Sequence, residues 1–208
     1  MSKSKKLVLV SLIAMIVISL CSVFNIKNLS SLVLVIGLVM YFVSKKSGES
    51  EDYLSFKEIP KSLKDFNVII LMVMPIVSGF LSTFLAQFVM PGFADHVSGR
   101  TSFVPTGNAI MLVPMLLIAA CGEEIAMRGF MQAQLEKYIK FVPALIITSL
   151  LFAMCHISTG PVLVVLYDLA FIAIDAIFYG LIFTKTRNLW ICTLSHFAAN
   201  LICILFFL

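Results

Sequence analysis

The residues with the clearest chemical potential are two adjacent glutamates and an arginine inside an apolar stretch. Glu123, Glu124 and Arg128 follow a hydrophobic run that begins near Ala109. A charge near the bilayer centre costs about 2.5–3.5 kcal/mol on insertion scales, so ionisable groups in such a run are candidates for function. On a helix, Glu124 and Arg128 can pair on one face, and Glu123, turned roughly 100° away, is the freer carboxylate. The alternative is a structural charge cluster or a water-exposed loop.

Two further motifs place polar side chains in apolar segments downstream. Phe152 and His156 are four residues apart, which puts the phenyl ring and the imidazole on one helix face. His196 and Asn200 have the same spacing, so their side chains converge. Each histidine alone is more typical of a satisfied core residue than of a catalyst. Because the acidic pair and these residues come from three apolar segments, a shared polar interior would give all of them partners, and we expect one buried site.

This set of side chains favours hydrolysis with water as the nucleophile. A carboxylate withdrawn from water, here Glu123, can act as a general base near neutral pH, and His156 could share or relay the proton. The amide of Asn200 and an N–H of His196 are donors suited to the oxyanion that develops on an attacked carbonyl. No serine or cysteine has an obvious base partner at short spacing. The expected reaction is hydrolysis of an acyl or peptide bond.

A metal ion is the competing account of the same residues. Glu123, His156 and His196 could supply the three ligands of a catalytic zinc ion, with water in the open position. The HExxH zinc motif is absent. We favour direct activation of water by the carboxylate and keep a divalent metal, zinc, as the alternative. Free thiols are expected for the cysteines, which show no CxxC spacing: Cys21, Cys121, Cys155, Cys192 and Cys203.

The composition indicates a membrane protein with several spans. The chain has 208 residues, of which 61% are hydrophobic and 12% are charged, and its mean hydropathy is +1.06. That apolar share exceeds the share in soluble domains, and runs long enough to cross a bilayer recur from end to end. The expected fold class is all-α, a bundle of about seven transmembrane helices in one integrated domain. The net charge of +4 is not gathered into a patch, so we expect no nucleic-acid partner.

Seven apolar segments account for the expected helices. They cover residues 7–24, 29–43, 66–90, 108–138, 141–156, 162–184 and 189–208. The first is interpreted as a retained span and not as a signal peptide, because it lacks a clear cleavage site. We treat 1–107 as N-terminal helices and loops and 108–208 as the catalytic core.

The segments between the spans carry expectations of their own. Residues 25–28 are expected to form a tight polar turn, and 44–65 a solvated loop with an interfacial helix as an option. Residues 91–107 are expected to form a loop that exposes His96 at the surface.

Asp168 and Asp175 interrupt the sixth apolar segment. We expect this pair to cap a re-entrant segment or to line the cavity, and not to catalyse. The sequence leaves open whether 162–169 spans the membrane or is re-entrant.

The distribution of basic residues favours a cytoplasmic N-terminus and an outside C-terminus in the cell membrane. With seven spans, only Lys27 and Arg100 fall in outside turns. Twelve basic residues fall in inside segments: Lys3, Lys5, Lys6, Lys45, Lys46, Lys57, Lys61, Lys64, Lys137, Lys140, Lys185 and Arg187.

The three motifs, in this order on successive apolar segments, resemble those of the CPBP family. This is the CAAX-protease and bacteriocin-processing family, also called Abi, of intramembrane endopeptidases. The motifs are Glu123-Glu124-x-x-x-Arg128, Phe152-x-x-x-His156 and His196-x-x-x-Asn200. The similarity covers about 108–204 and includes Gly129-Phe130 after the first motif and Thr186-Arg187-Asn188-Leu189-Trp190 before the last. Met127 departs from the aromatic residue that is usual before the arginine, a change expected to affect packing.

The resemblance implies a glutamate-dependent membrane protease related to the Ras-converting CAAX prenyl endopeptidase. The family is often labelled metalloprotease, and its metal requirement is disputed. The implied partners are a peptide or membrane-protein substrate and the lipid bilayer. The implied setting is bacterial, with a role in peptide maturation, bacteriocin self-immunity or signalling and without prenylated substrates. The implied roles are water activation by Glu123 and His156, oxyanion stabilisation by His196 and Asn200, and support by Glu124, Arg128 and Phe152.

Two other functions remain as alternatives. A non-proteolytic immunity or scaffold protein would bind and sequester a partner, and it would have no need for a complete set of catalytic residue types. A small proton-coupled transporter would use the intramembrane acids as a relay, and it would leave His196 and Asn200 without a clear purpose.

Overall fold

The regular elements of the described residues are all helices, which confirms the all-α fold class. The computed structural model describes residues 2–24, 29–102 and 108–207. The N-terminal elements are α1 (Lys3–Cys21), η1 (Ser22–Phe24), α2 (Leu29–Lys46), α3 (Ile59–Ser62), α4 (Phe66–Val89) and α5 (Phe93–Arg100). The C-terminal elements are α6 (Ala109–Glu124), η2 (Ile125–Gln132), α7 (Ala133–Leu135), α8 (Phe141–Met154), α9 (Val162–Thr186) and α10 (Leu189–Phe207).

Seven of these helical stretches are apolar, as expected for a multi-pass membrane protein. By length and composition, α1, α2, α4, the α6–η2–α7 stretch and α9 can each cross a membrane. The apolar helices α8 and α10 are shorter within the described residues. Large apolar side chains are exposed along the outer faces of the helices, for example Val10, Val17 and Phe84. Such a surface suits lipid, because the hydrocarbon core has no hydrogen bonds to offer.

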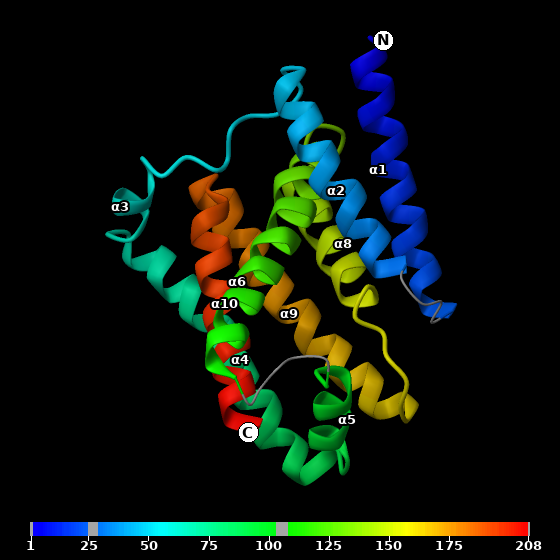
Figure 1. Ribbon diagram of the computed structural model, residues 1–208, viewed down its shortest axis with the longest axis vertical. Coiled ribbons are helices and arrows are strands. Elements are labelled where there is room, and N and C mark those ends of the chain that lie inside the picture. Colours follow the sequence, from blue (N-terminus) through cyan, green and yellow to red (C-terminus); the bar gives the residue numbers. More distant parts are fainter. Residues whose placement is uncertain (1, 25–28, 103–107, 208) are drawn as a thin grey trace.

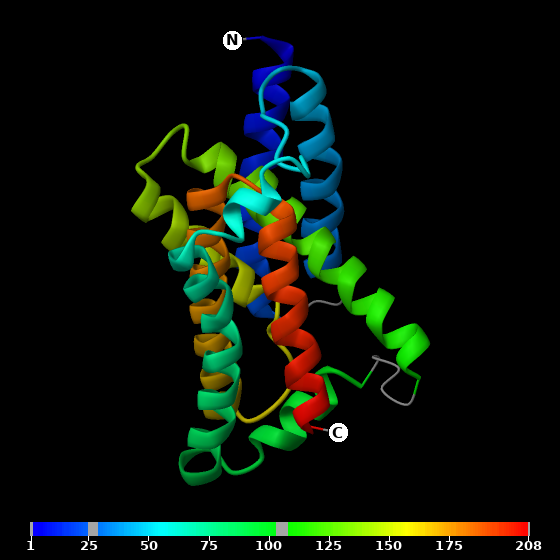
Figure 2. The same cartoon turned by 90° about the vertical axis from the view of Figure 1, so that its left-hand side faces the viewer.

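Helices α9 and α10 pack against each other and connect the other helices of the C-terminal half with α4. The two flanks of α9 pack against α4 and α8, and α10 packs against α4, α6 and α9. The first two helices lie side by side, and α2 also packs against η2. The N-terminus lies at one end of the long axis and the C-terminus toward the other, both in Figure 1 and in the perpendicular view of Figure 2.

The helix that carries the first motif changes its winding directly after the acidic pair. It begins as expected at Asn108, whose side chain accepts from the backbone N–H of Ile110 at 3.1 Å. After Glu124, however, η2 is a π-helix, and the helical stretch ends at Leu135, short of the expected 138. A π-helix bonds each N–H five residues back, and such segments are frequent at functional sites. Apolar periodicity does not reveal this change.

One close approach explains why η2 can lie against α2. A Cβ atom added to Gly37 of α2 would lie 2.5 Å from Ala126 Cβ and 2.8 Å from Ala126 Cα. A Cβ on Gly129 of η2 would lie 2.9 Å from Leu189 of α10 and 3.1 Å from the Tyr41 ring of α2. Both glycines therefore let the backbone of η2 approach its neighbours, and η2 is fixed in the interior.

One expected loop differs from the prediction, and a second contains a short helix, as the prediction allowed. Residues 93–100 form the helix α5, although 91–107 was expected to be a loop, and 103–107 lie outside the described residues. The expected solvated loop 44–65 contains α3 and is fastened to the start of α10, where Asn188 Nδ2 donates to Ser55 O at 2.6 Å and Trp190 Nε1 donates to Leu54 O at 2.9 Å.

The remaining boundaries are close to the expected ones. The polar turn at 25–28 lies outside the described residues. Residues 162–169 are the first turns of the continuous helix α9, so they form no separate re-entrant segment. His156 lies in a turn after α8, which ends at Met154 and not at the expected 156.

Candidate active site

Glu124 lies at the centre of a fully buried polar network. Its side chain is 0% exposed and that of Arg128 is 1% exposed. Arg128 Nη1 donates to Glu124 Oε1 at 3.3 Å, and Arg128 Nη2 donates to the backbone oxygen of Ala176 in α9 at 2.8 Å. His196 Nδ1 lies 2.8 Å from the same Glu124 oxygen. Glu124 therefore pairs with Arg128 on its own helix and also orients the histidine of α10.

Glu123 has a different environment from its neighbour. Its side chain is 28% exposed. Its Oε2 atom lies 3.9 Å from His156 Nε2 and 3.7 Å from His196 Nε2. The fold thus brings together one carboxylate and two imidazoles from α6, α10 and the turn after α8.

The tautomer of His156 follows from its backbone contact. Its Nδ1 lies 2.9 Å from the carbonyl oxygen of Phe152. A carbonyl oxygen only accepts, so Nδ1 carries the proton and donates it. In the neutral ring, Nε2 is then an acceptor, and this is the atom that faces Glu123. The hydrogen bond across one turn also holds the ring in place beyond the end of α8.

Aromatic rings enclose the charged centre. Arg128 lies over the Phe152 ring at 4.8 Å and over the Tyr179 ring at 5.4 Å. The Tyr179 ring stacks on His196 with a centroid distance of 4.6 Å and an interplanar angle of 15°. Phe152 also contacts the His156 ring, at 4.6 Å between centroids. These rings exclude water and contribute cation–π attraction to Arg128.

Tyr179 is a site residue that the sequence reasoning missed. It lies in an apolar segment without a motif of its own. Its position on the same face of α9 as Asp175, one turn away, is the signal that could have marked it.

The proposed catalytic side chains face one large cavity. This cavity has a volume of about 650 Å³, within the usual range of ligand pockets. Its walls come from both halves of the chain, since Pro75 and Phe93 line it as well. Its polar lining includes Glu123, His156, His196, Asn200, Asp168 and Asp175. Asn200 therefore lies on the cavity wall, one turn from His196 on α10.

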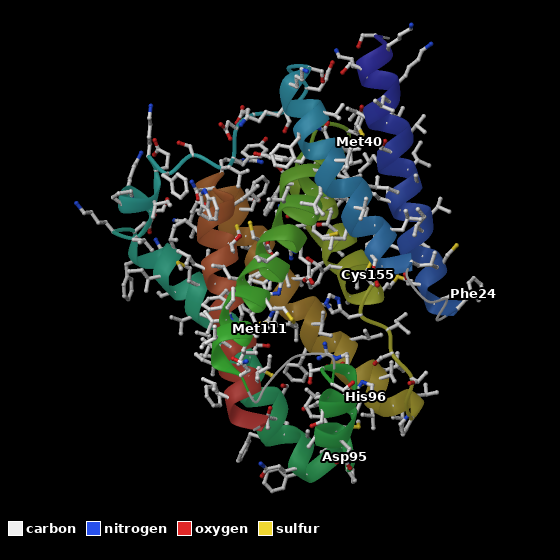
Figure 3. All side chains as sticks on the ribbon, viewed as in Figure 1. Phe24, Met40, Asp95, His96, Met111 and Cys155 are labelled. Atoms are coloured by element: carbon white, nitrogen blue, oxygen red, sulfur yellow. The ribbon has the colours of Figure 1, made fainter. Side chains whose placement is uncertain are left out.

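A second polar cluster lies on the wall of the same cavity, between α5 and α9. Arg100 Nε lies 2.9 Å from Asp168 Oδ2, and Arg100 Nη2 donates to Asp168 Oδ1 at 3.3 Å. His96 Nε2 lies 3.3 Å from Asp168 Oδ2, and the His96 side chain is only 4% exposed. The expectation of a surface histidine was wrong, because α5 turns His96 toward the bundle, as Figure 3 shows. Asp168 was expected either to cap a re-entrant segment or to line the cavity, and it lines the cavity.

The positions of Glu123, His156 and His196 do not match the ligand geometry of a zinc ion. By type, Glu123, His156 and His196 suit zinc. Zinc bonds of about 2.0–2.1 Å in a tetrahedral site hold ligand atoms roughly 3.3 Å apart, whereas the observed separations from Glu123 are 3.9 and 3.7 Å. Within the described ranges, no group of three His, Cys, Asp or Glu side chains could hold a metal ion. We therefore derive no step through a metal.

The comparisons with known proteins agree with the motif pattern. Residues 105–202 match the family described as Rce1-like, type II CAAX prenyl endopeptidase. No curated protein and no solved structure matches the chain. The matched range contains all three motifs together with the α9 residues that pack against them. Over residues 105–202 the chain is therefore similar to the Rce1-like family of type II CAAX prenyl endopeptidases, which indicates a membrane protease, and its apolar helices are those of a multi-pass membrane protein.

Proposed function

We propose that this protein hydrolyses a peptide bond of a membrane-associated peptide or protein with a water molecule activated by Glu123 and His156. One observation carries the proposal, the convergence of Glu123 Oε2 on His156 Nε2 at 3.9 Å and on His196 Nε2 at 3.7 Å. These separations exceed hydrogen-bond length, yet one oxygen atom at about 2.8 Å from each group fits between them. A water molecule at this position would be within hydrogen-bond distance of Glu123, the proposed base, and of His156, the proposed proton relay.

The chemical step then follows from the proton positions. Glu123 accepts one proton of the water while the oxygen attacks the substrate carbonyl carbon, and the carbonyl electron pair moves to its oxygen. Collapse of this oxyanion breaks the C–N bond. The leaving nitrogen receives the proton from Glu123, directly or through His156. The products are a new carboxylate and a new amine.

Stabilisation of the oxyanion is assigned to Asn200 and His196. The Asn200 amide is a donor on the cavity wall. His196 Nδ1 is engaged with Glu124 at 2.8 Å, so donation from Nε2 requires the doubly protonated ring. The Glu124 carboxylate is a suitable counter-charge for that form. Glu124 would thus act through His196, as a positioning residue.

The substrate is proposed to be a membrane-associated peptide in peptide maturation, bacteriocin self-immunity or signalling. The motif resemblance supports this class, and the cavity supplies room for an extended segment. Peptide mass mapping of membranes that contain the wild type, Glu123→Gln or His156→Ala tests it. We expect wild-type products to disappear in both variants, with unchanged insertion. Full cleavage by Glu123→Gln would contradict the mechanism, and a phenotype that survives loss of Glu123 and His196 would favour a scaffold role.

A further inference from the structure

The cavity contains one carboxyl group that the proposed mechanism does not use and that forms no ion pair within the described residues. Of the three carboxylates in its lining, Asp168 is paired with Arg100, and Glu123 faces the two histidines. Asp175 forms no ion pair with any residue of the described ranges. Its Oδ1 atom is buried and lacks a hydrogen-bond partner there. The neutral Ser78 hydroxyl beside the carboxyl group supplies no counter-charge.

The position of Asp175 relates it to the reaction centre. It precedes Tyr179 by four residues on α9, and the Tyr179 ring stacks on His196. Asp175 therefore lies one helical turn from the ring that contacts His196, and it lines the same cavity as Glu123 and His196.

We propose that Asp175 is a specificity subsite that binds a basic side chain of the substrate, lysine or arginine, near the scissile bond. This inference rests on the proposed function, because it assigns a substrate feature to the same cavity. A partly buried carboxyl group without an ion-pair partner is unfavourable in its charged form, and an entering ammonium or guanidinium group supplies the missing charge. A charge-assisted hydrogen bond is stronger than a neutral one. Asp168 cannot serve in the same way, because Arg100 and His96 already occupy its oxygens.

Cleavage of matched peptides tests the subsite. The full chain in liposomes receives quenched fluorescent decapeptides of alanine and leucine, in which one position near the scissile bond carries lysine or uncharged norleucine. At one position the wild type is expected to show at least about a tenfold higher kcat/KM for the lysine peptide. Asp175→Asn should bring that ratio close to one, and Asp175→Glu should preserve part of it. A wild type without preference, or an Asp175→Asn variant that keeps it, would overturn the subsite.

The control removes an equal charge away from the cavity. Asp95 is an exposed residue on the side of α5 that faces away from the bundle (Figure 3), and it is outside the cavity lining. Asp95→Asn should therefore keep the lysine-to-norleucine ratio of the wild type. A similar loss of preference in Asp95→Asn would point to a long-range charge effect and would overturn a specific contact at Asp175.

A measurement of peptide binding without cleavage distinguishes a failure of the subsite from a failure of the proposed hydrolysis. In the Glu123→Gln background, fluorescence anisotropy with the same two peptides should give about tenfold tighter binding of the lysine peptide, and additional Asp175→Asn should remove the difference. If this difference appears while no peptide is cleaved by the wild type, the subsite stands and the proposed hydrolysis fails. If Glu123-dependent cleavage occurs but both peptides bind equally, the subsite fails and the hydrolysis stands.

Discussion

Adjacent carboxylates in one helix can have opposite tasks because their surroundings differ. Glu124 is fully buried and holds both Arg128 and His196. Glu123, one residue earlier, is 28% exposed and faces the cavity. Helical geometry turns consecutive side chains roughly 100° apart, so one points into the bundle and the other toward the cavity. This division explains why the two residues should respond differently to the same substitution.

Glu124→Gln should cost both stability and activity. The change leaves the buried Arg128 without its counter-charge, and breaking a buried pair in this way typically costs about 3–5 kcal/mol. It also removes the carboxylate that orients His196, so we expect cleavage to fall at least tenfold. Denaturant unfolding of the purified protein and a cleavage assay measure the two effects. A variant with wild-type stability and activity would exclude a structural role for Glu124.

At the scale of single residues, the sequence predicts contacts between side chains that are one helical turn apart, and it does not predict contacts between distant segments. The i, i+4 spacing of Glu124 and Arg128 is sufficient to pair them. The contacts of Arg100 and His96 with Asp168 join α5 to α9, which lie far apart in the chain. No local sequence pattern predicts these contacts. The stacking of Tyr179 on His196 likewise depends on the crossing of α9 and α10.

At the scale of elements, the π-helix η2 lies entirely in the interior of the bundle. It packs between α2 and the start of α10, and all of its residues are buried. Apolar runs predict where helices lie, so the seven apolar segments are found within a few residues. They do not predict a change of hydrogen-bond register within a helix. They also miss α5, because its short polar sequence lies beside Pro91 and Gly92 and is typical of a loop.

Gly37→Ala should weaken the contact between α2 and η2. The added methyl group meets the Cβ and backbone of Ala126 at 2.5 and 2.8 Å, so one helix has to move. Overpacking of this kind costs about 1–3 kcal/mol. The matched control is Gly79→Ala in α4, where an added Cβ meets nothing within 4 Å and helix propensity favours alanine. Unfolding midpoints in detergent compare them, and equal midpoints would refute close packing at Gly37.

At the scale of the whole molecule, the lining of the cavity is the feature that the sequence does not fully predict, because it forms only when the helices pack together. The cavity exists because α4, α5, α6, α9 and α10 meet around it, and its lining combines residues from both halves of the chain. The division into 1–107 and 108–208 therefore stays a prediction, while the cavity itself requires both parts. Composition was sufficient to predict a multi-pass helical bundle, since apolar length decides that property.

The proposed orientation in the membrane has a direct test. The N-terminus and C-terminus lie toward opposite ends of the bundle (Figures 1 and 2), and the excess of basic residues favours a cytoplasmic N-terminus. A green fluorescent protein fused to the C-terminus should stay dark in a bacterial host, and a fused periplasmic phosphatase should be active. A green fluorescent protein fused after Lys140, in a segment predicted to be cytoplasmic, is the control and should fluoresce. Fluorescence from the C-terminal fusion would reverse the assigned orientation.

The central claim, that Glu123 activates the water, is tested most directly by the cleavage rate of purified Glu123→Gln in liposomes. The control is Glu58→Gln, an exposed glutamate before α3 with no side-chain cap contact. Loss of a general base predicts a fall of at least about 100-fold in kcat, with the unfolding midpoint close to that of the wild type, while Glu58→Gln keeps full activity. A folded Glu123→Gln protein that cleaves at the wild-type rate would contradict the claim.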